Sequence, residues 1–224
     1  MIPLRDNTYS HSFPFVNVII IVLNVLIFLY QQSMPQDLLV LFFYNFGVTP
    51  AQVINQVIAG ESLLITGFPF ISCIFLHGGW LHLLGNMLYL WIFGDNVEDR
   101  IGHLRYLLFY LLIGIISSIA HIISVPESQV PIIGASGAIA GIMGAYFLAF
   151  PKAKILTLVP VFFFITFIQV PAIIFLPIWF AIQIINGLST AGMGADAVAW
   201  WAHIGGFISG VILMPFFARR MVKH

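Results

Sequence analysis

Charge is what this sequence has least of. Asp, Glu, Lys and Arg make up 7% of its 224 residues, whereas soluble domains carry about 25%. Hydrophobic residues account for 61% of the chain, above the soluble range of roughly 45–50%. These two values exclude an ordinary soluble domain and predict an all-α membrane protein. Basic and acidic residues balance at eight each, so no excess of positive charge points to a nucleic-acid partner.

Cysteine and membrane-embedded acid are also scarce. The single cysteine, Cys73, cannot form an intramolecular disulfide and has no cysteine neighbours that would make a metal site, so we interpret it as a packing residue. The H-E-x-x-H sequence that metalloproteases carry on a helix is absent. A pair of embedded aspartates, which an aspartyl protease requires, is absent too. We therefore expect neither a metal ion nor another cofactor.

Uncharged apolar runs fill most of the chain. Because a helix needs about 20 apolar residues to cross the hydrocarbon core, these runs predict six spans in a single domain covering residues 1–224. The expected bounds are 13–30, 78–94, 104–125, 136–150, 169–187 and 198–218. The long run 155–188 contains Pro160, Pro171 and Pro177. Since proline tends to end helices, we expect an interfacial lead-in there, followed by one span.

The basic residues predict the orientation of the bundle, because short loops rich in lysine and arginine stay in the cytoplasm. With six spans, all eight basic residues fall on the side of the N-terminus: Arg5, Arg100, Arg105, Lys152, Lys154, Arg219, Arg220 and Lys223. The opposite loops carry only Asp37, Glu61, Glu127 and Asp196. We therefore expect both termini in the cytoplasm. The loop 31–77 is expected outside, with its apolar stretch 38–46 in the membrane interface.

A few polar side chains lie at one depth within the expected spans, where such groups are costly and are candidates for function. His77 and His82 lie in the outer part of the second span, and Asn86 follows His82 by one helical turn. Ser136 opens the fourth span, and His203 lies near the outer end of the sixth. These three spans run in the same direction, so the five residues are expected to converge below the external surface.

The fourth span is expected to begin inside the membrane. Its 15 or so residues measure about 22 Å as a helix, less than the roughly 30 Å of the hydrocarbon core. The segment 130–135 would then enter as irregular backbone lining a wet cavity. Ser136 would occupy a submerged helix N-terminus, where unpaired N–H groups and the helix dipole favour a developing negative charge. That environment suits an acyl-transfer reaction.

The remaining candidates have complementary roles around Ser136. By its depth, His203 is the expected general base. His82 and Asn86, four residues apart on one helical face, are expected to donate hydrogen bonds to an oxyanion beside the backbone N–H of Ser136. His77 lies about 140° from His82 around a helix, so we expect it to support the site from the cavity rim or from the junction with the preceding loop. Gly137 on the fourth span and Gly206 on the sixth allow these two helices to approach closely.

Three motifs carry a resemblance to a known family. Gly134-Ala135-Ser136-Gly137 resembles the rhomboid G-x-S-G motif. His77, His82 and Asn86 match the family's H-x4-H-x3-N pattern, and the segment 202–206 matches its A-H-x-x-G. The similarity also takes in residues 4–6 and 94–100, and so covers nearly the whole chain. One departure is the Trp-Arg pair of the first external loop, which is missing from 31–72 and leaves the conformation of this loop open.

The resemblance implies a six-helix rhomboid bundle with an intramembrane serine protease site. In this interpretation Ser136 and His203 form a catalytic dyad without an aspartate. His82, Asn86 and Ser136 stabilise the oxyanion, and His77, Gly134, Gly137 and Gly206 support them. The implied substrates are transmembrane segments of other proteins, cut near their external ends. The compact core favours a multi-pass protein of a prokaryotic plasma membrane, with an active site that opens to the extracytoplasmic side. An organellar enzyme whose presequence has been removed is the alternative that stays open.

Several alternatives stay open at this point. A protein of the same fold that binds transmembrane helices without cutting them, or a small transporter, would also need a polar cavity. The presence of both Ser136 and His203 argues against the first, and the lack of embedded carboxylates argues against a proton-coupled transporter. The residues 98–100 are expected to be a solvated or capping cluster in a cytoplasmic loop. The loop 191–194 would be either a lid over the site or a flexible connection. The sequence names neither the substrate nor the oligomeric state.

Overall fold

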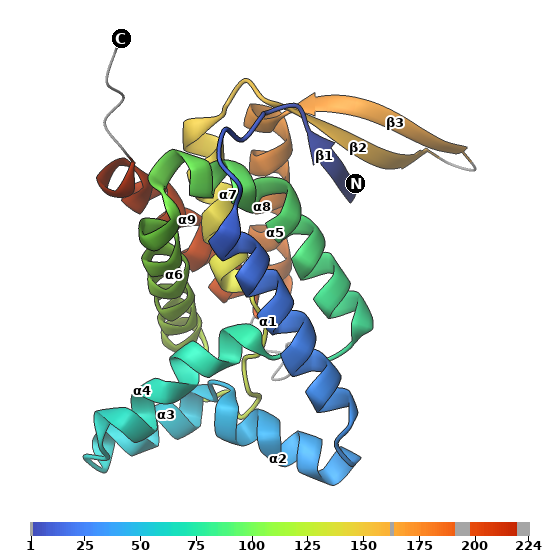
Figure 1. The fold of residues 1–224 in the computed structure, drawn as a ribbon. Coiled ribbons are helices and arrows are strands. Elements are labelled where there is room, and N and C mark those ends of the chain that lie inside the picture. The colour runs from blue at the N-terminus through green and yellow to red at the C-terminus, as the bar shows by residue number, and fades with distance from the viewer. Residues whose placement is uncertain (1, 162–163, 191–197, 219–224) are drawn as a thin grey trace.

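The structure is a computed structural model that describes residues 2–161, 164–190 and 198–218. A bundle of long helices forms its body, and a small antiparallel sheet lies at one end (Figure 1). The bundle helices are α1 (Phe15–Gln32), α5 (Trp80–Ile101), α6 (His103–Ser124), α7 (Ser136–Ala149), α8 (Ala172–Thr190) and α9 (Trp200–Phe217). Their positions agree with the expected spans, with ends that differ by a few residues. The main difference is α5, which continues to Ile101 rather than ending at residue 94.

Four of these helices are long and apolar enough to cross a membrane, namely α1, α6, α8 and α9. A fifth candidate is the pair Leu63–Phe75 and Trp80–Ile101, whose two parts are bent by 84° relative to each other. Helix α7 is apolar but shorter, as the sequence suggested. The described residues therefore form a multi-pass helical membrane bundle.

Helix α7 is the centre of the bundle. It packs against α5, α6, α8 and α9, and its residues Gly137 to Tyr146 are all buried. The contact with α9 is the closest, because glycines face each other there. A Cβ atom added to Gly210 would lie 1.9 Å from the carbonyl oxygen of Gly141, and one added to Gly206 would lie 2.1 Å from that of Gly137. The two backbones touch directly, as the glycine spacing predicted.

The loop between α1 and α5 is helical rather than irregular. It contains α2 (Gln36–Phe46), α3 (Pro50–Ile58), α4 (Leu63–Ser72) and the short 3-10 helix η1 (Cys73–Phe75). These helices lie across the end of the bundle opposite the sheet (Figure 1). Helix α2 covers the stretch 38–46 and leaves Leu38, Leu41 and Tyr44 exposed. Cys73 is buried and free, in agreement with a packing role.

The sheet was not expected from the sequence. It consists of β1 (Ile2–Asp6), β2 (Lys154–Val161) and β3 (Phe164–Pro171) in the order β1-β2-β3, with both pairs antiparallel. The predicted interfacial lead-in is therefore a strand pair, and the span predicted to start at residue 169 begins at Ala172. Runs of β-branched and aromatic residues favour strands, and Pro171 closes β3 just before α8. By contrast, Pro177 lies inside α8 without ending it.

The acidic cluster after the expected second span is also not a loop. Glu98 and Asp99 belong to the last turn of α5, which ends at Gly102 with a positive φ of 89°. Glu98 is fully buried and accepts the backbone N–H groups of Val16 and Asn17 at 3.0 and 2.7 Å. It thereby satisfies the first turn of α1, which has no side-chain cap of its own. The capping interpretation is confirmed. The prediction that residues 98–100 lie in a loop is wrong, because they belong to α5.

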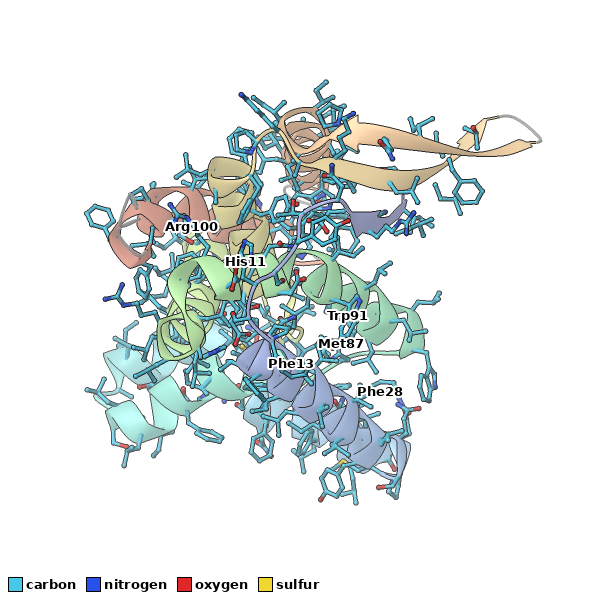
Figure 2. All side chains as sticks on the ribbon, turned by 45° about the horizontal axis from the view of Figure 1, so that its top comes forward. His11, Phe13, Phe28, Met87, Trp91 and Arg100 are labelled. Carbon is cyan, nitrogen blue, oxygen red and sulfur yellow. The ribbon has the colours of Figure 1, made fainter. Side chains whose placement is uncertain are left out.

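Figure 2 shows how α1 is attached to α5. Figure 2 shows Phe28 and Met87 where α1 faces α5, and both side chains are buried. At the sheet end, Figure 2 labels His11 close to the end of α5, and the backbone N–H of His11 donates to Asp99 at 3.2 Å. Helix α1 is thus fixed to α5 by apolar contacts along its length and by acidic side chains at its start.

Candidate active site

Ser136 is the first residue of α7, at the point where the chain changes from irregular backbone to helix. Ala135 before it is fully buried, so this helix start lies inside the protein. The incoming segment is held by Gly134, whose N–H donates to the carbonyl of Cys73 at 2.9 Å, and by the bridge between Val48 and Ile132. The N–H groups of a first helical turn have no partner within the helix. Ser136 therefore presents a hydroxyl beside free backbone donors.

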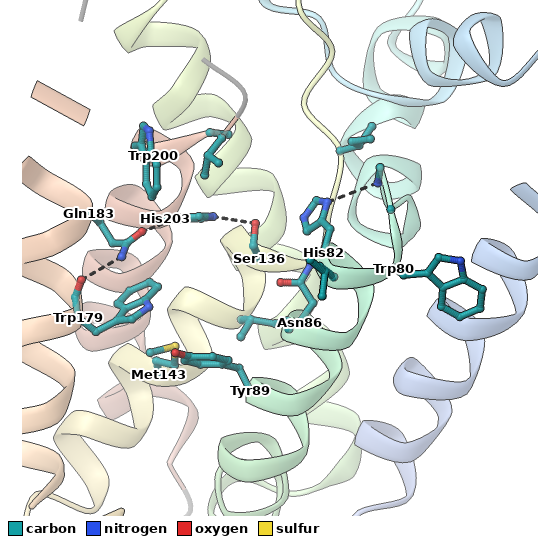
Figure 3. A pocket seen from close by; sticks show the side chains of 18 residues that line it. Trp80, His82, Asn86, Tyr89, Ser136, Met143, Trp179, Gln183, Trp200 and His203 are labelled. Atoms are coloured by element: carbon teal, nitrogen blue, oxygen red, sulfur yellow. Dashed lines mark hydrogen bonds between the residues drawn. The ribbon is translucent and has the colours of Figure 1, made fainter. Parts of the chain in front are cut away.

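His203 meets Ser136 from the first turns of α9. Its Nε2 atom lies 2.8 Å from Ser136 Oγ, and its ring is 8% exposed. The indole rings of Trp179 on α8 and Trp200 on α9 each lie 6.0 Å from the imidazole, centroid to centroid. Its other nitrogen, Nδ1, lies 2.9 Å from Oε1 of Gln183 on α8. Figure 3 shows the chain of contacts from α8 through His203 to Ser136.

His82 reaches the same place from α5. Its Nδ1 accepts the backbone N–H of Gly78 at 3.4 Å, which leaves the proton of a neutral ring on Nε2. That nitrogen is directed at Gly134, where an added Cβ would lie 2.6 Å from it. Gly134 also has a positive φ of 122°. Only glycine fits this position without strain, and its lack of a side chain lets His82 approach the start of α7.

Asn86 lies one turn further along α5 and is held by His77. Its Nδ2 lies 2.9 Å from His77 Nε2, so one of its two N–H bonds points to this ring and the other remains for the cavity. His77 is nearly fully buried, at 1% exposure. Gln31 of α1 clamps its backbone by donating to the His77 carbonyl at 3.0 Å and accepting its N–H at 3.2 Å.

These side chains border one cavity of about 880 Å³, within the range of pockets that hold small ligands or peptide side chains. Its polar wall is made of His82, Asn86, Ser136, Gln183 and His203, and none of the described residues that line it carries a carboxylate. The remaining lining is mostly apolar and aromatic, including Tyr89, Met143 and Trp179, which Figure 3 shows below the polar groups. The cavity lies between α5 on one side and α8 and α9 on the other.

The other expected site residues take part in packing. A Cβ added to Gly137 would lie 2.3 Å from Ser117 Oγ, and Gly206 faces the carbonyl of Gly137. Both glycines therefore set the distance between α6, α7 and α9. Among the described residues, no group of three His, Cys, Asp or Glu side chains could hold a metal ion. The expected lid at 191–194 lies outside the described residues.

Sequence reasoning missed Gln183 and its neighbour Trp179. Of the amide side chains within the expected spans, the sequence pattern indicates Asn86 alone, because it follows His82 by one turn. The available signal was position: Trp179 and Gln183 are four residues apart, so they share a face of α8. Gln183 also lies near the outer end of the expected span 169–187, at the depth expected for His203.

Together the apolar helices and the cavity with its polar wall define a multi-pass helical membrane protein that contains a serine-histidine pair. Comparison with known proteins gives the family. The model of the Rhomboid domain matches residues 64–220, so the chain belongs to the rhomboid family, whose members are generally serine proteases of the membrane.

Several curated relatives agree with this assignment. RHOMBOID-like protein 4 of Arabidopsis thaliana is 32% identical over 161 residues, which are 71% of this chain and 35% of the relative. Rhomboid-like protein 11, chloroplastic, of the same plant is 35% identical over 103 residues, 44% of this chain and 36% of the relative. The mouse presenilin-associated rhomboid-like protein, mitochondrial, is 28% identical over 152 residues, 64% of this chain and 36% of the relative. The chain thus spans about a third of the length of these relatives.

Proposed function

We propose that this protein is an intramembrane serine endopeptidase that cuts transmembrane segments of other membrane proteins through a Ser136–His203 dyad. The observation that carries the proposal is the 2.8 Å separation of Ser136 Oγ and His203 Nε2 beside a cavity. A serine hydroxyl becomes an effective nucleophile when a base at hydrogen-bond distance takes its proton. Its membership of the rhomboid family supports the same class of chemistry.

In the proposed first step Ser136 Oγ attacks the carbonyl carbon of the scissile peptide bond while His203 Nε2 accepts the hydroxyl proton. The carbonyl oxygen becomes an oxyanion. His82 Nε2–H, the second amide N–H of Asn86 and the backbone N–H of Ser136 are the donors proposed to stabilise it. Preorganised donors of this kind contribute about 10²–10³ each to kcat. His77 and Gly134 act by holding Asn86 and by leaving room for His82.

In the second half of the reaction the protonated His203 donates its proton to the leaving amine, and the peptide bond breaks. A water molecule then loses a proton to His203 and attacks the carbonyl carbon of the acyl-enzyme. The bond from this carbon to Ser136 Oγ breaks, His203 returns its proton to Oγ, and the acid product leaves. A helical peptide bond is shielded by its own backbone, so the substrate has to unwind locally before the attack. Small or helix-breaking residues near the cut should therefore favour cleavage.

The proposed topology has six spans, α1, α5, α6, α7, α8 and α9, with both termini in the cytoplasm. Support comes from charge: Arg5 and Lys154 lie on the sheet at one end of the bundle, and Glu61 lies beside α4 at the other. Basic residues favour the cytoplasmic side. The cavity would then open to the extracytoplasmic side of a plasma membrane, with substrate entering laterally beside α8. The single rhomboid domain, residues 1–224, acts without a cofactor in this proposal.

Cleavage of a model transmembrane substrate by the purified protein in detergent tests the proposal. Ser136→Ala and His203→Ala should each abolish cleavage and prevent labelling of Ser136 by a fluorophosphonate, whereas a chelator should have no effect. Ser124→Ala is the matched control, because Ser124 is exposed on α6 away from the cavity. If the wild-type protein cuts none of a broad panel of substrates and is not labelled, a helix-binding role replaces the protease.

A further inference from the structure

Gln183 connects α8 to the histidine of the site. Its side chain is 4% exposed and makes two hydrogen bonds with the described residues. Nε2 donates to the backbone carbonyl of Trp179 at 3.0 Å, and Oε1 lies 2.9 Å from His203 Nδ1. Figure 3 shows both contacts, with Gln183 on the side of His203 opposite Ser136.

The first contact fixes the direction of the amide. A backbone carbonyl can only accept, so the group facing Trp179 has to be the NH2 group. The oxygen of Gln183 therefore faces His203. Since this oxygen can only accept, Nδ1 of His203 has to carry a proton. In a neutral imidazole the other nitrogen is then bare, so Nε2 presents its lone pair to the Ser136 hydroxyl.

The opposite tautomer would place two acceptors, Gln183 Oε1 and Nδ1, against each other in a buried site. It would also direct an N–H from His203 Nε2 toward Ser136. Nε2 could not then act as a base for the Ser136 hydroxyl. Leaving a buried acceptor without a donor is costly enough to shift a tautomer ratio by roughly 5- to 150-fold. Among the described residues that line the cavity there is no carboxylate, and Gln183 Oε1 is the acceptor that faces Nδ1.

We propose that Gln183 is the positioning residue of this site: its amide oxygen holds His203 in the Nδ1–H tautomer and orients the ring toward Ser136. This rests on the protease function proposed above. The role corresponds to that of an acidic third residue in other serine hydrolases, with one difference. A neutral amide orients the ring without adding a negative charge, so it does not stabilise the protonated imidazole electrostatically.

The surroundings of His203 are consistent with this division of labour. Within the described part of the chain, the titratable groups that act on it are His82 of α5 and His121 of α6, and neither brings a negative charge. Trp179 and Trp200 flank the ring, but ring contacts do not select a tautomer. Among the described residues, Gln183 of α8 therefore supplies the hydrogen bond that orients the far side of the imidazole.

A spectroscopic experiment tests the tautomer without relying on activity. The ring 15N shifts of histidine-labelled protein in detergent distinguish the two neutral tautomers, and the signals of His203 are those lost in His203→Ala. We expect a protonated Nδ1 and a bare Nε2 in the wild type, and a mixture of tautomers in Gln183→Leu. A protonated Nε2 in the wild type would overturn the proposal, even if the protein cleaves substrates.

Kinetics with two variants test the consequence. Gln183→Leu should lower the rate of cleavage and of fluorophosphonate labelling about 10- to 100-fold, part of the 10²–10⁴ that a general base contributes. Gln183→Glu keeps an acceptor for Nδ1–H and should recover most of this loss. Its carboxylate also stabilises the protonated ring, so the acid limb of the pH–rate profile should move to higher pH.

Gln169→Leu is the matched control, because it makes the same substitution at an exposed position of β3 outside the cavity. The activity of this variant should equal that of the wild type. Equal activity of folded Gln183→Leu and wild type would contradict the proposal. An unshifted profile for Gln183→Glu would do so as well, and this variant keeps the test decisive if Gln183→Leu fails to fold. If the wild type shows neither cleavage nor labelling, the protease function is refuted instead. The 15N spectrum separates this failure from failure of the Gln183 proposal, because it reports the tautomer of His203 without requiring activity.

Discussion

At the scale of single residues, Gly134 combines two constraints that point to one purpose. Its positive φ of 122° is costly for any residue with a side chain, and the space for a Cβ is already taken by His82. The backbone conformation therefore serves to bring an imidazole N–H next to Ser136. A glycine in this position is part of the geometry of the proposed oxyanion site rather than a flexible joint.

Gly134→Ala should accordingly lose activity more than stability. The new Cβ would lie 2.6 Å from His82 Nε2, so His82 has to move away from the position of the oxyanion. We expect a fall in kcat of about 10²-fold or more, as for loss of one oxyanion donor, measured with the model substrate. Gly67→Ala in α4 is the control, because an added Cβ there meets no atom within 4 Å. Equal kcat values for both variants would contradict this interpretation.

The residues of the site show what the sequence could and could not supply. Ser136, His203, His82 and Asn86 could be chosen because polar groups are rare in apolar spans, and the structure brings them to one cavity. The contact of Asn86 with His77 could not be predicted from the sequence. Helix α5 begins at Trp80, so His77 lies before it and the angle calculated for His77 and His82 on one helix does not apply. A contact that forms because the chain bends depends on tertiary packing. The spacing of residues along the sequence gives no information about such a bend.

At the scale of elements, the contact between α7 and α9 decides whether the dyad forms. Gly210 lies on α9 two turns beyond His203, and its Cα faces the carbonyl of Gly141. Because the two backbones touch, any side chain at this position has to separate the helices. The separation would extend to the start of α7 and change the distance from His203 to Ser136.

Gly210→Ala should therefore reduce both stability and activity. Its Cβ would lie 1.9 Å from a backbone oxygen, and overpacking of this kind costs about 1–3 kcal/mol. Thermal unfolding in detergent should show a lower Tm than the wild type, together with slower labelling of Ser136. Ile212→Ala, on an exposed position of the same helix, provides the comparison. A Tm no lower than that of Ile212→Ala would mean that the helices can repack without loss.

The sheet adds a polar contact with a defined pH dependence. Burial raises the pKa of the Asp6 carboxyl above 3.8, and hydrogen bonds from Tyr146 and Thr8 partly offset this effect. A raised pKa in the folded state means that the protonated form is favoured by folding. The associated stability is present below pH 3.8 and is lost as the pH rises through the raised pKa.

Asp6→Asn removes this titration while keeping an acceptor for Tyr146. The stability of the variant relative to the wild type should increase as the pH is raised from about 4, and should become constant once Asp6 is ionised. Thermal unfolding of both proteins over this range measures the difference, in which the titrating groups that Asp6 does not influence cancel. The charge of Asp6 also raises the pKa of the Asp95 carboxyl, so the difference reports the two carboxyls together. A difference that is independent of pH would show that Asp6 has the same pKa in the folded and unfolded chain.

The elements also mark the limit of sequence analysis. Long apolar runs identified the bundle helices, because a membrane-spanning helix has no competing structure. The same argument failed for residues 154–171, where the apolar run forms β2 and β3. Both a buried helix and a strand pair satisfy an uninterrupted apolar run, and the partner strand β1 is about 150 residues away in the sequence.

At the scale of the whole molecule, the charge distribution predicts a measurable topology. Cys73 is buried, so single cysteines introduced elsewhere can be labelled against a low background. In sealed vesicles, Lys152→Cys should react with an impermeant maleimide only from the cytoplasmic side, and Glu61→Cys only from the opposite side. The unmodified chain, labelled in parallel, measures the background. Labelling of both positions from one side would contradict the six-span arrangement.

The sheet gives the molecule an unusual mechanical link. Strand β1, at the beginning of the chain, pairs with β2, which pairs with β3, and β3 leads directly into α8. Helix α8 carries Trp179 and Gln183 on one wall of the cavity. An affinity tag or fusion partner attached ahead of Ile2 is therefore connected, through the three paired strands, to α8, the helix whose Gln183 contacts His203. Preparations of this protein that differ only in their tags should be compared for the proposed cleavage activity before any difference is assigned to lipid or detergent.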